Sequence, residues 1–356
     1  MASQSSPDAG HTPSIKTTYR QDRSPLMAIL QSCLKPFNTK LVAPKKEFPA
    51  GSPKLDIPGK SRKKLDVTER KVEDIWLYEF RRKETLQSSK HESGAKKTSR
   101  RLYYFAGGGW QAPASSQHWS LITEMALQLP EFVVTLVSYP LAPHTPAPVA
   151  FPQIMHLYNA LLSSAQEANE EVIFAGDSAG GNIVLSLAVN SLLANPDALC
   201  PKAIMAICPS TDLRRSNPEM KEIEKKDPLL RMPFVVSSAN AWRGAWDASD
   251  VRVSPLLADF GPLSRRDVKI HGVTGTYDIL SPDAALLREK YALFSAHVSV
   301  WLVGGEGCEG LDTGCHQAIL GQSKEQGLAR RCLHDAVSDA LRNNLSLHRN
   351  FSELEI

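Results

Sequence analysis

The sequence predicts an α/β protein built on a mostly parallel, doubly wound sheet flanked by helices. Short apolar runs typical of buried strands alternate with amphipathic segments of ten or more residues. The run over residues 132–139 is apolar almost throughout, as expected for a parallel strand buried on both faces. In residues 171–182, an apolar run ends in a serine flanked by glycines, and a helical pattern follows.

The remaining elements follow the same alternation along the chain. The predicted strands are residues 70–80, 102–106, 132–139, 172–175, 203–208, 268–274 and 298–303. The predicted helices are residues 118–129, 151–168, 182–194, 282–295 and 323–343.

Three segments interrupt this pattern and define the expected domain organisation. Residues 1–23 are polar and predicted to be disordered, and residues 24–68 are predicted to form an N-terminal cap or lid segment. Residues 213–250 are rich in charge and then in aromatic side chains, which indicates a helical cap insertion. The α/β core then comprises residues 69–212 and 251–345.

Charge is distributed unevenly. Residues 1–100 hold 21 Lys and Arg against 11 Asp and Glu, although the whole chain has a net charge of only +3. This basic part has no interleaved aromatic residues and no nucleic-acid motif, so we expect no nucleic-acid partner. Residues 24–36 read as a short helix with an apolar face, which leaves open a weak contact with a membrane surface.

Cysteine usage and the N-terminus bear on location. Residues 1–10 have neither a basic region nor an apolar core of a secretory signal, and no apolar run is long enough to span a membrane. The six cysteines show no C-x-x-C spacing. We therefore expect a cytoplasmic protein with reduced thiols, with a peripheral membrane position as the alternative. The sequence does not predict an oligomeric state.

Residues 171–182 indicate a nucleophilic serine. Gly176 and Gly180 stand two residues before and after Ser178, where side chains would collide in a sharp strand-to-helix turn. Such a turn holds the serine hydroxyl in a cleft. A phosphate-binding turn is the alternative, but the Lys and Ser or Thr of a P-loop do not follow.

A nucleophilic serine requires a base and an orienting acid, and each has a candidate. Asp278 follows a predicted strand and precedes a helix, at the sheet edge where sites of open α/β folds gather. Its rival, Asp283, is expected to cap the following helix. His316 is the only histidine between the last predicted strand and the final helix, so it is the candidate base.

The glycine run at residues 107–109 follows a strand and predicts an oxyanion hole. We expect the backbone N–H groups of Gly107, Gly108 and Ala179 to be its donors. Three side chains are predicted to contact substrate: Trp110, Asp177 and Tyr139. For Asp177, a contact with the glycine run and a favourable position at a helix N-terminus are the alternatives.

These residues together resemble the hormone-sensitive-lipase-like carboxylesterases of the α/β-hydrolase fold over about residues 100–343. The matching segments are Gly176-Asp-Ser-Ala-Gly-Gly-Asn182, the glycine run, Tyr139-Pro-Leu-Ala-Pro143 and Ser254-Pro-Leu-Leu257. The sequence around the glycine run, Tyr104-Phe-Ala-Gly-Gly-Gly-Trp-Gln111, most resembles that of fungal members of the family, some of which modify secondary metabolites. The resemblance implies hydrolysis of a small or medium acyl ester by Ser178, Asp278 and His316, with a small-molecule ester as partner and no cofactor or metal.

Two departures from the family pattern keep alternatives open. Ala106 stands where the family usually has a histidine that orders the glycine run, and residues 308–315 look inserted ahead of His316. An acyltransferase or chain-releasing enzyme would use the same triad. A catalytically silent small-molecule binder would result if the inserted residues displace His316.

Overall fold

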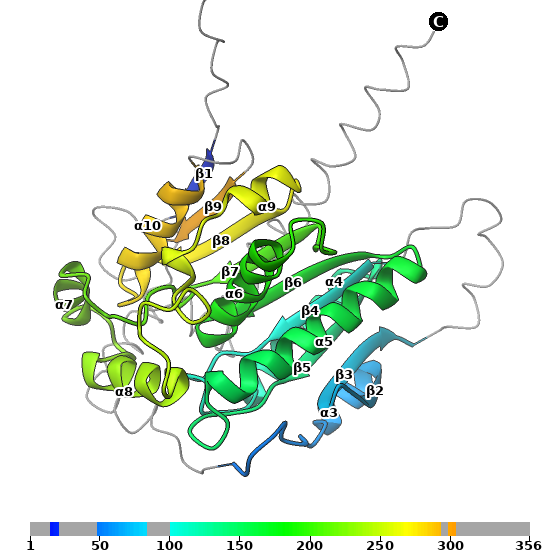
Figure 1. Ribbon diagram of the computed structural model, residues 1–356. Coiled ribbons are helices and arrows are strands. Elements are labelled where there is room, and N and C mark those ends of the chain that lie inside the picture. The colour runs from blue at the N-terminus through cyan, green and yellow to red at the C-terminus, as the bar shows by residue number, and fades with distance from the viewer. Residues whose placement is uncertain (1–14, 21–47, 84–99, 293–297, 304–356) are drawn as a thin grey trace, which may run out of the picture.

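A computed structural model describes residues 15–20, 48–83, 100–292 and 298–303 of the chain (Figure 1). The strands are β1 (Ile15–Arg20), β2 (Leu65–Val72), β3 (Ile75–Arg82), β4 (Arg100–Phe105), β5 (Phe132–Ser138), β6 (Glu171–Asp177), β7 (Ala203–Ile207), β8 (Lys269–Gly275) and β9 (Val298–Val303). The helices are α3 (Gly59–Lys64), α4 (Ser116–Gln128), α5 (Ala147–Glu167), α6 (Ala179–Ala194), α7 (Glu219–Glu224), α8 (Met232–Arg243), α9 (Gly261–Arg265) and α10 (Ser281–Ala292), with the 3-10 turn η3 at Pro255–Leu257.

The described strands form one sheet in the order β1-β9-β8-β7-β6-β4-β5-β3-β2. All neighbours from β1 to β5 in this order pair parallel, and β3 pairs antiparallel with both β5 and β2. The predicted fold class, a mostly parallel sheet flanked by helices, is therefore confirmed.

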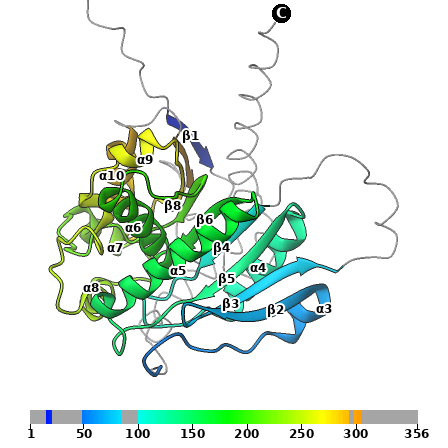
Figure 2. The same ribbon diagram turned by 45° about the vertical axis from the view of Figure 1, so that its right-hand side comes forward.

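Side chains that alternate along the central strands divide the core into two layers. Phe105 and Phe174 face the layer that also holds the apolar faces of α5 and α6. Their chain neighbours Tyr104 in β4 and Ala175 in β6 face the other layer, which holds the apolar face of α4. Strand side chains point alternately to the two faces of a sheet, so both faces of β4 and β6 are covered. Figure 2 shows α5 and α6 together over one face.

The first predicted strand is in fact a hairpin. The sequence predicts one strand over residues 70–80, whereas β2 and β3 are joined by a two-residue turn at Glu73 and Asp74. Both turn residues have positive φ, 47° and 60°, the conformation of the tight hairpin turns that favour Asn or Gly. Glu-Asp is a weak signal for such a turn, which explains why the sequence pattern did not reveal it.

The N-terminal boundaries also differ from expectation. Residues 15–20, predicted to be disordered, form β1 at the edge of the sheet beside β9. The described part of the expected lid, residues 48–68, runs along the opposite edge: the Ser52 hydroxyl donates to the carbonyl of Ser138 at 2.6 Å, and α3 and the start of β2 follow. Residues 15–20 and 65–68 therefore contribute to the outer strands of the sheet. The predicted helices over residues 24–36 and 323–343 lie outside the described residues.

Residues 213–250 contain two helices, α7 and α8, between β7 and β8. Met220, Leu230 and Val235 of this insertion form a small apolar cluster with Ile279 and Leu280, which precede α10. Figure 1 shows α7 and α8 side by side at one end of the sheet. Among the described helices, none combines the length and apolar character that crossing a membrane requires.

Candidate active site

Ser178 lies in a strained turn between β6 and α6. Its φ of 50° and ψ of −113° fall in a region that residues with a side chain rarely adopt. Its N–H donates to the carbonyl of Ile207 at 2.8 Å, and its own carbonyl accepts from the N–H of Ser210 at 3.1 Å. Both neighbours lie at or after the end of β7, so the turn is held at the carboxyl edge of the sheet.

The glycines around Ser178 permit a close backbone approach. A Cβ atom at Gly180 would lie 1.9 Å from the carbonyl oxygen of Phe105, and one at Gly176 would lie 2.5 Å from the carbonyl carbon of Gly180. These distances are far inside van der Waals contact. The first turn of α6 therefore packs directly on the end of β4, as the spacing of the two glycines predicts.

The loop after β4, residues 106–112, is called the glycine loop below. Its Gly107 N–H donates to Oδ1 of Asp177 at 2.9 Å, and the hydroxyl of Tyr104 donates to the same oxygen at 2.9 Å. The expectation that Gly107 supplies an oxyanion donor is therefore corrected, because its N–H already has a buried acceptor. A Cβ at Gly107 would lie 2.3 Å from Oδ2 of Asp177, so any larger residue at this position would collide with the carboxylate.

Further hydrogen bonds fix the remainder of the glycine loop. The carbonyl of Gly108 accepts from the N–H groups of Gln111 and Ala112, both at 3.1 Å. Among the described residues, the N–H groups of Gly108 and Gly109 have no protein acceptor. The φ values of Gly108 and Gly109, 136° and 61°, explain the need for glycine at both positions.

Three side chains predicted to touch substrate instead support this loop. Trp110 is buried and stacks on Trp242 of α8, with ring centroids 5.8 Å apart. Tyr139 is buried and its hydroxyl donates to the carbonyl of Ala106 at 2.8 Å. Asp177 is 1% exposed and contacts the glycine loop, one of the alternatives offered by the sequence. Each of the three side chains therefore has a polar or ring contact within the fold.

Asp278 lies just beyond the carboxyl end of β8, where the sequence places the acid. Its side chain is 4% exposed, and Oδ1 accepts from the N–H of Leu280 at 2.9 Å. The rival, Asp283, lies within the first turn of α10 and accepts from Nδ2 of Asn217 at 2.9 Å. Asp283 therefore ties the residues after β7 to α10.

A second carboxylate beside Asp278 was not predicted. Asp227, from the insertion, accepts at Oδ1 from the N–H groups of Leu229 and Leu230, both at 2.8 Å. Its Oδ2 accepts from the N–H of Ile279 at 2.9 Å. Burial, and then the negative charge of Asp278, raise the pKa of Asp227 to about 7. Asp227 follows the charged residues of α7, and nothing in the sequence there indicates a carboxylate that lies beside Asp278.

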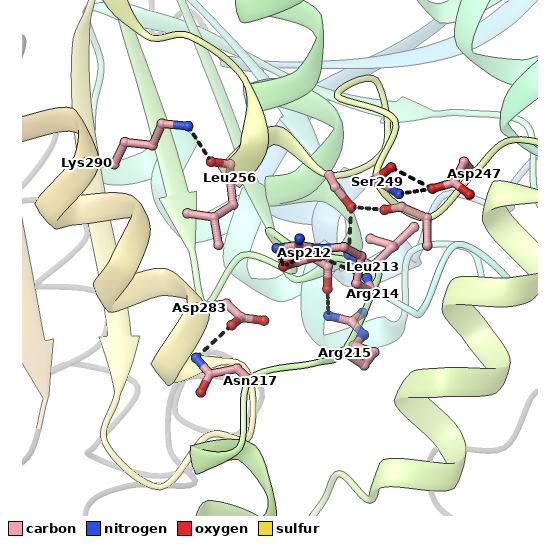
Figure 3. Close-up of polar contacts among 12 residues, drawn as sticks. Asp212, Leu213, Arg214, Arg215, Asn217, Asp247, Ser249, Leu256, Asp283 and Lys290 are labelled. Atoms are coloured by element: carbon pink, nitrogen blue, oxygen red, sulfur yellow. Dashed lines mark hydrogen bonds and ion pairs between the residues drawn. The ribbon is translucent and has the colours of Figure 1, made fainter.

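Arg215, on the loop after β7, is a buried cation that the sequence analysis also did not reveal. Its guanidinium donates to the Ser210 hydroxyl at 2.7 Å and to the carbonyl of Asp212 at 2.9 Å. Figure 3 shows Arg215 and Asn217 on the loop that faces Asp283 of α10. Burial lowers the pKa of Arg215 to about 10, while the negative charge of Asp283 acts in the opposite direction.

His316, the predicted base, lies outside the described residues, as do residues 308–315. The described residues therefore bring together the strained Ser178, the glycine loop and the carboxyl ends of β6, β7 and β8. Ala179 begins α6, and N–H groups in the first turn of a helix have no acceptor within the helix.

Comparison with known proteins agrees with this geometry. A model of the alpha/beta hydrolase fold family matches residues 102–308. Human hormone-sensitive lipase is 31% identical over 150 residues, which is 40% of this chain and 13% of the lipase. The chain thus spans a small part of that relative.

Solved structures share the fold at low identity. Carboxyl esterase 2 from the mycorrhizal fungus Tuber melanosporum has a TM-score of 0.67 and 17% identity, over 88% of this chain and 98% of that one. An esterase/lipase from an uncultured bacterium has a TM-score of 0.65 and 19% identity, over 90% of this chain and 100% of that one. The chain belongs to the α/β-hydrolase fold family.

Proposed function

We propose that the protein is a serine carboxylester hydrolase that acts on a small or medium acyl ester. The observation that carries this proposal is the strained conformation of Ser178 at the carboxyl edge of the sheet. The turn packs against a glycine loop in which the N–H groups of Gly108 and Gly109 have no acceptor among the described residues. Backbone strain of this kind is costly, and it concentrates at reactive sites. The relatives, a lipase and two esterases, support the same chemistry.

The proposed mechanism is acyl transfer through a covalent intermediate. Oγ of Ser178 attacks the ester carbonyl carbon while His316, oriented by Asp278, takes the hydroxyl proton. The tetrahedral intermediate collapses, and His316 returns the proton to the departing alcohol. Water then attacks the acyl-enzyme with His316 again acting as base, which releases the acid and restores Ser178.

The oxyanion hole is proposed to consist of backbone donors only. Its donors are the N–H groups of Gly108 and Ala179, as the sequence predicts, together with the N–H of Gly109 in place of that of Gly107. This choice follows from the hydrogen bonds: Gly107 donates to Asp177, whereas the other two loop glycines have no protein acceptor among the described residues. Loss of one such donor typically lowers the rate by about a hundredfold or more.

The insertion is proposed to shape the substrate pocket. A Cβ at Gly109 would lie 3.1 Å from the ring of Phe234 and 3.2 Å from Ser238, so α8 lies directly against the glycine loop. An ester of a secondary metabolite is the substrate class that the sequence resemblance favours. A cytoplasmic location, with residues 24–36 in weak contact with a membrane surface, is part of the same proposal.

Hydrolysis of p-nitrophenyl esters from acetate to decanoate tests this function. Wild type, Ser178→Ala and His316→Ala are compared in parallel, with His156→Ala as the matched control because His156 is an exposed residue of α5. We expect turnover by wild type and the control, loss of turnover in the other two, and a preference for short or medium chains. Activity retained in Ser178→Ala contradicts the proposal.

Adding an excess of a small alcohol to the same assay separates hydrolysis from acyl transfer. A hydrolase releases mainly the free acid, whereas an acyltransferase releases mainly the new ester. A folded wild type that turns over no ester and is not labelled by a fluorophosphonate is instead a binder.

A further inference from the structure

We propose that His118 of α4 is a positioning residue that holds the glycine loop through Asp177, an inference that rests on the esterase function proposed above. Nε2 of His118 lies 3.3 Å from Oδ2 of Asp177. The other oxygen of the same carboxylate accepts from the N–H of Gly107 at 2.9 Å. The Asp177 carboxylate thus bridges a histidine on one helix and the backbone of the loop.

All parts of this bridge are shielded from water. His118 is 5% exposed and Asp177 is 1% exposed, while Tyr104, which donates to Oδ1, is fully buried. A buried carboxylate needs donors on its oxygens, and hydrogen bonds to charged groups are stronger than those between neutral groups. His118 supplies a donor to Oδ2, and thereby fixes the orientation in which Oδ1 meets Gly107.

The start of α4 selects the tautomer that can donate. The backbone N–H of Ser115, the N-cap residue, donates to Nδ1 of His118 at 3.0 Å. A ring nitrogen that accepts a hydrogen bond carries no proton, so the neutral imidazole carries its proton on Nε2. The capping interaction therefore directs the Nε2–H group toward Asp177.

The local sequence explains why the loop depends on a distant side chain. Ala106 is buried at the head of the loop and has no polar group to offer. Tyr139 holds the carbonyl of Ala106, but the next N–H group, that of Gly107, is held by Asp177. The donors proposed for the oxyanion, Gly108 and Gly109, come directly afterwards, so a displaced Gly107 displaces them as well.

Four variants separate this role from a general contribution to stability. His118→Leu removes the donor, whereas His118→Gln keeps it, because an amide at this position can accept from Ser115 and donate to Asp177 as in a capping box. Ser115→Ala weakens the helix cap and removes the hydroxyl that lies 2.9 Å from Nδ1 of His118, but it leaves the backbone N–H that fixes the tautomer. His156→Leu is the matched control on an exposed histidine of α5.

Two measurements are made on each variant. Hydrogen exchange followed by mass spectrometry reports the protection of the glycine loop, and does so without requiring activity. Steady-state hydrolysis of p-nitrophenyl butyrate gives kcat and KM, and the melting temperature is recorded alongside. Small displacements of groups that stabilise a transition state lower kcat more than they raise KM.

For His118→Leu we expect faster exchange in the glycine loop and a kcat about tenfold lower, with KM within about twofold of wild type. His118→Gln should recover kcat to within about threefold, and Ser115→Ala should lower the melting temperature while keeping kcat. Unchanged loop exchange in His118→Leu overturns the inference, as does an equal loss of kcat in His118→Leu and Ser115→Ala. If wild type turns over no ester and its Ser178 takes no fluorophosphonate, the proposed function fails, while loop exchange still decides whether His118 anchors the loop.

Discussion

The carbonyl oxygen of Phe105 lies 1.9 Å from the position that a Cβ atom of Gly180 would occupy. This approach presses the first turn of α6 onto the end of β4. It brings the turn that carries Ser178 next to the glycine loop, which starts one residue after Phe105. The proximity of Ser178 to the glycine loop is thus a consequence of one missing side chain.

Gly180→Ala should therefore damage both stability and activity. The added methyl group meets backbone atoms that cannot rotate away, so α6 or β4 must shift, at a cost of about 3 kcal/mol or more in the free energy of unfolding. Gly59→Ala is the matched control, because a Cβ there meets nothing within 4 Å. Urea denaturation and ester hydrolysis measure the two effects. A variant as stable and active as wild type would show that the close approach is not present.

The pH dependence of stability should report Asp227. Its pKa is about 4 in an unfolded chain and about 7 in the fold, so the fold favours the protonated carboxyl. The resulting stabilisation is present in full below about pH 4 and is lost as the pH rises through about 7. Asp227→Asn, which is neutral at every pH, should flatten this decline. Urea denaturation at several pH values from 4 to 8 measures it, and parallel curves for variant and wild type contradict the assignment.

Trp242→Leu should loosen the contact between the insertion and the glycine loop. The Trp110 and Trp242 rings are nearly parallel, with an interplanar angle of 7°, and both are buried. The variant loses this stack and leaves a cavity, which costs about 2–4 kcal/mol. Val236→Ala on the same helix is the control, since Val236 is 38% exposed. An altered order of preference among acyl chain lengths is also expected, and an unchanged order would argue against a role of α8 in the pocket.

Arg215 and Asp283 should show coupled effects on stability. The positive charges of Arg215 and Arg214 both act on the buried carboxylate of Asp283, so Arg215→Met should lower the free energy of unfolding by removing one of them. Asp283→Asn in the same chain should recover part of this loss. A double-mutant cycle by urea denaturation measures the coupling, and strictly additive effects of the two substitutions would show that the charges do not interact.

The sequence predicted the fold because its signals are local and repeated. Apolar runs and glycine spacing identify β6, Ser178 and α6 directly, and Asp278 follows from its position after a strand. The edges of the sheet were less predictable. A Glu-Asp turn joins β2 to β3, and β1 pairs with β9 across almost the whole length of the chain.

The role of each site residue depends on contacts that no spacing rule contains. Asp177 was assigned several roles from its place beside Ser178, and only its hydrogen bond to Gly107 separates them. His118 and Asp227 gave no signal, because their partners lie 59 and 52 residues away in the chain. Gly107 looked like a donor because glycine runs suggest free N–H groups, whereas its lack of a side chain is what admits Asp177.

The most direct measurement is mass mapping of the protein after reaction with a fluorophosphonate, a reagent that reacts with activated serine hydroxyls. The account predicts one adduct per chain, located on Ser178, and none in Ser178→Ala. It also predicts that His316→Ala reacts far more slowly, since the hydroxyl then lacks its base. An unlabelled but folded wild type, or an adduct on another residue, would contradict the claim that Ser178 is an activated nucleophile.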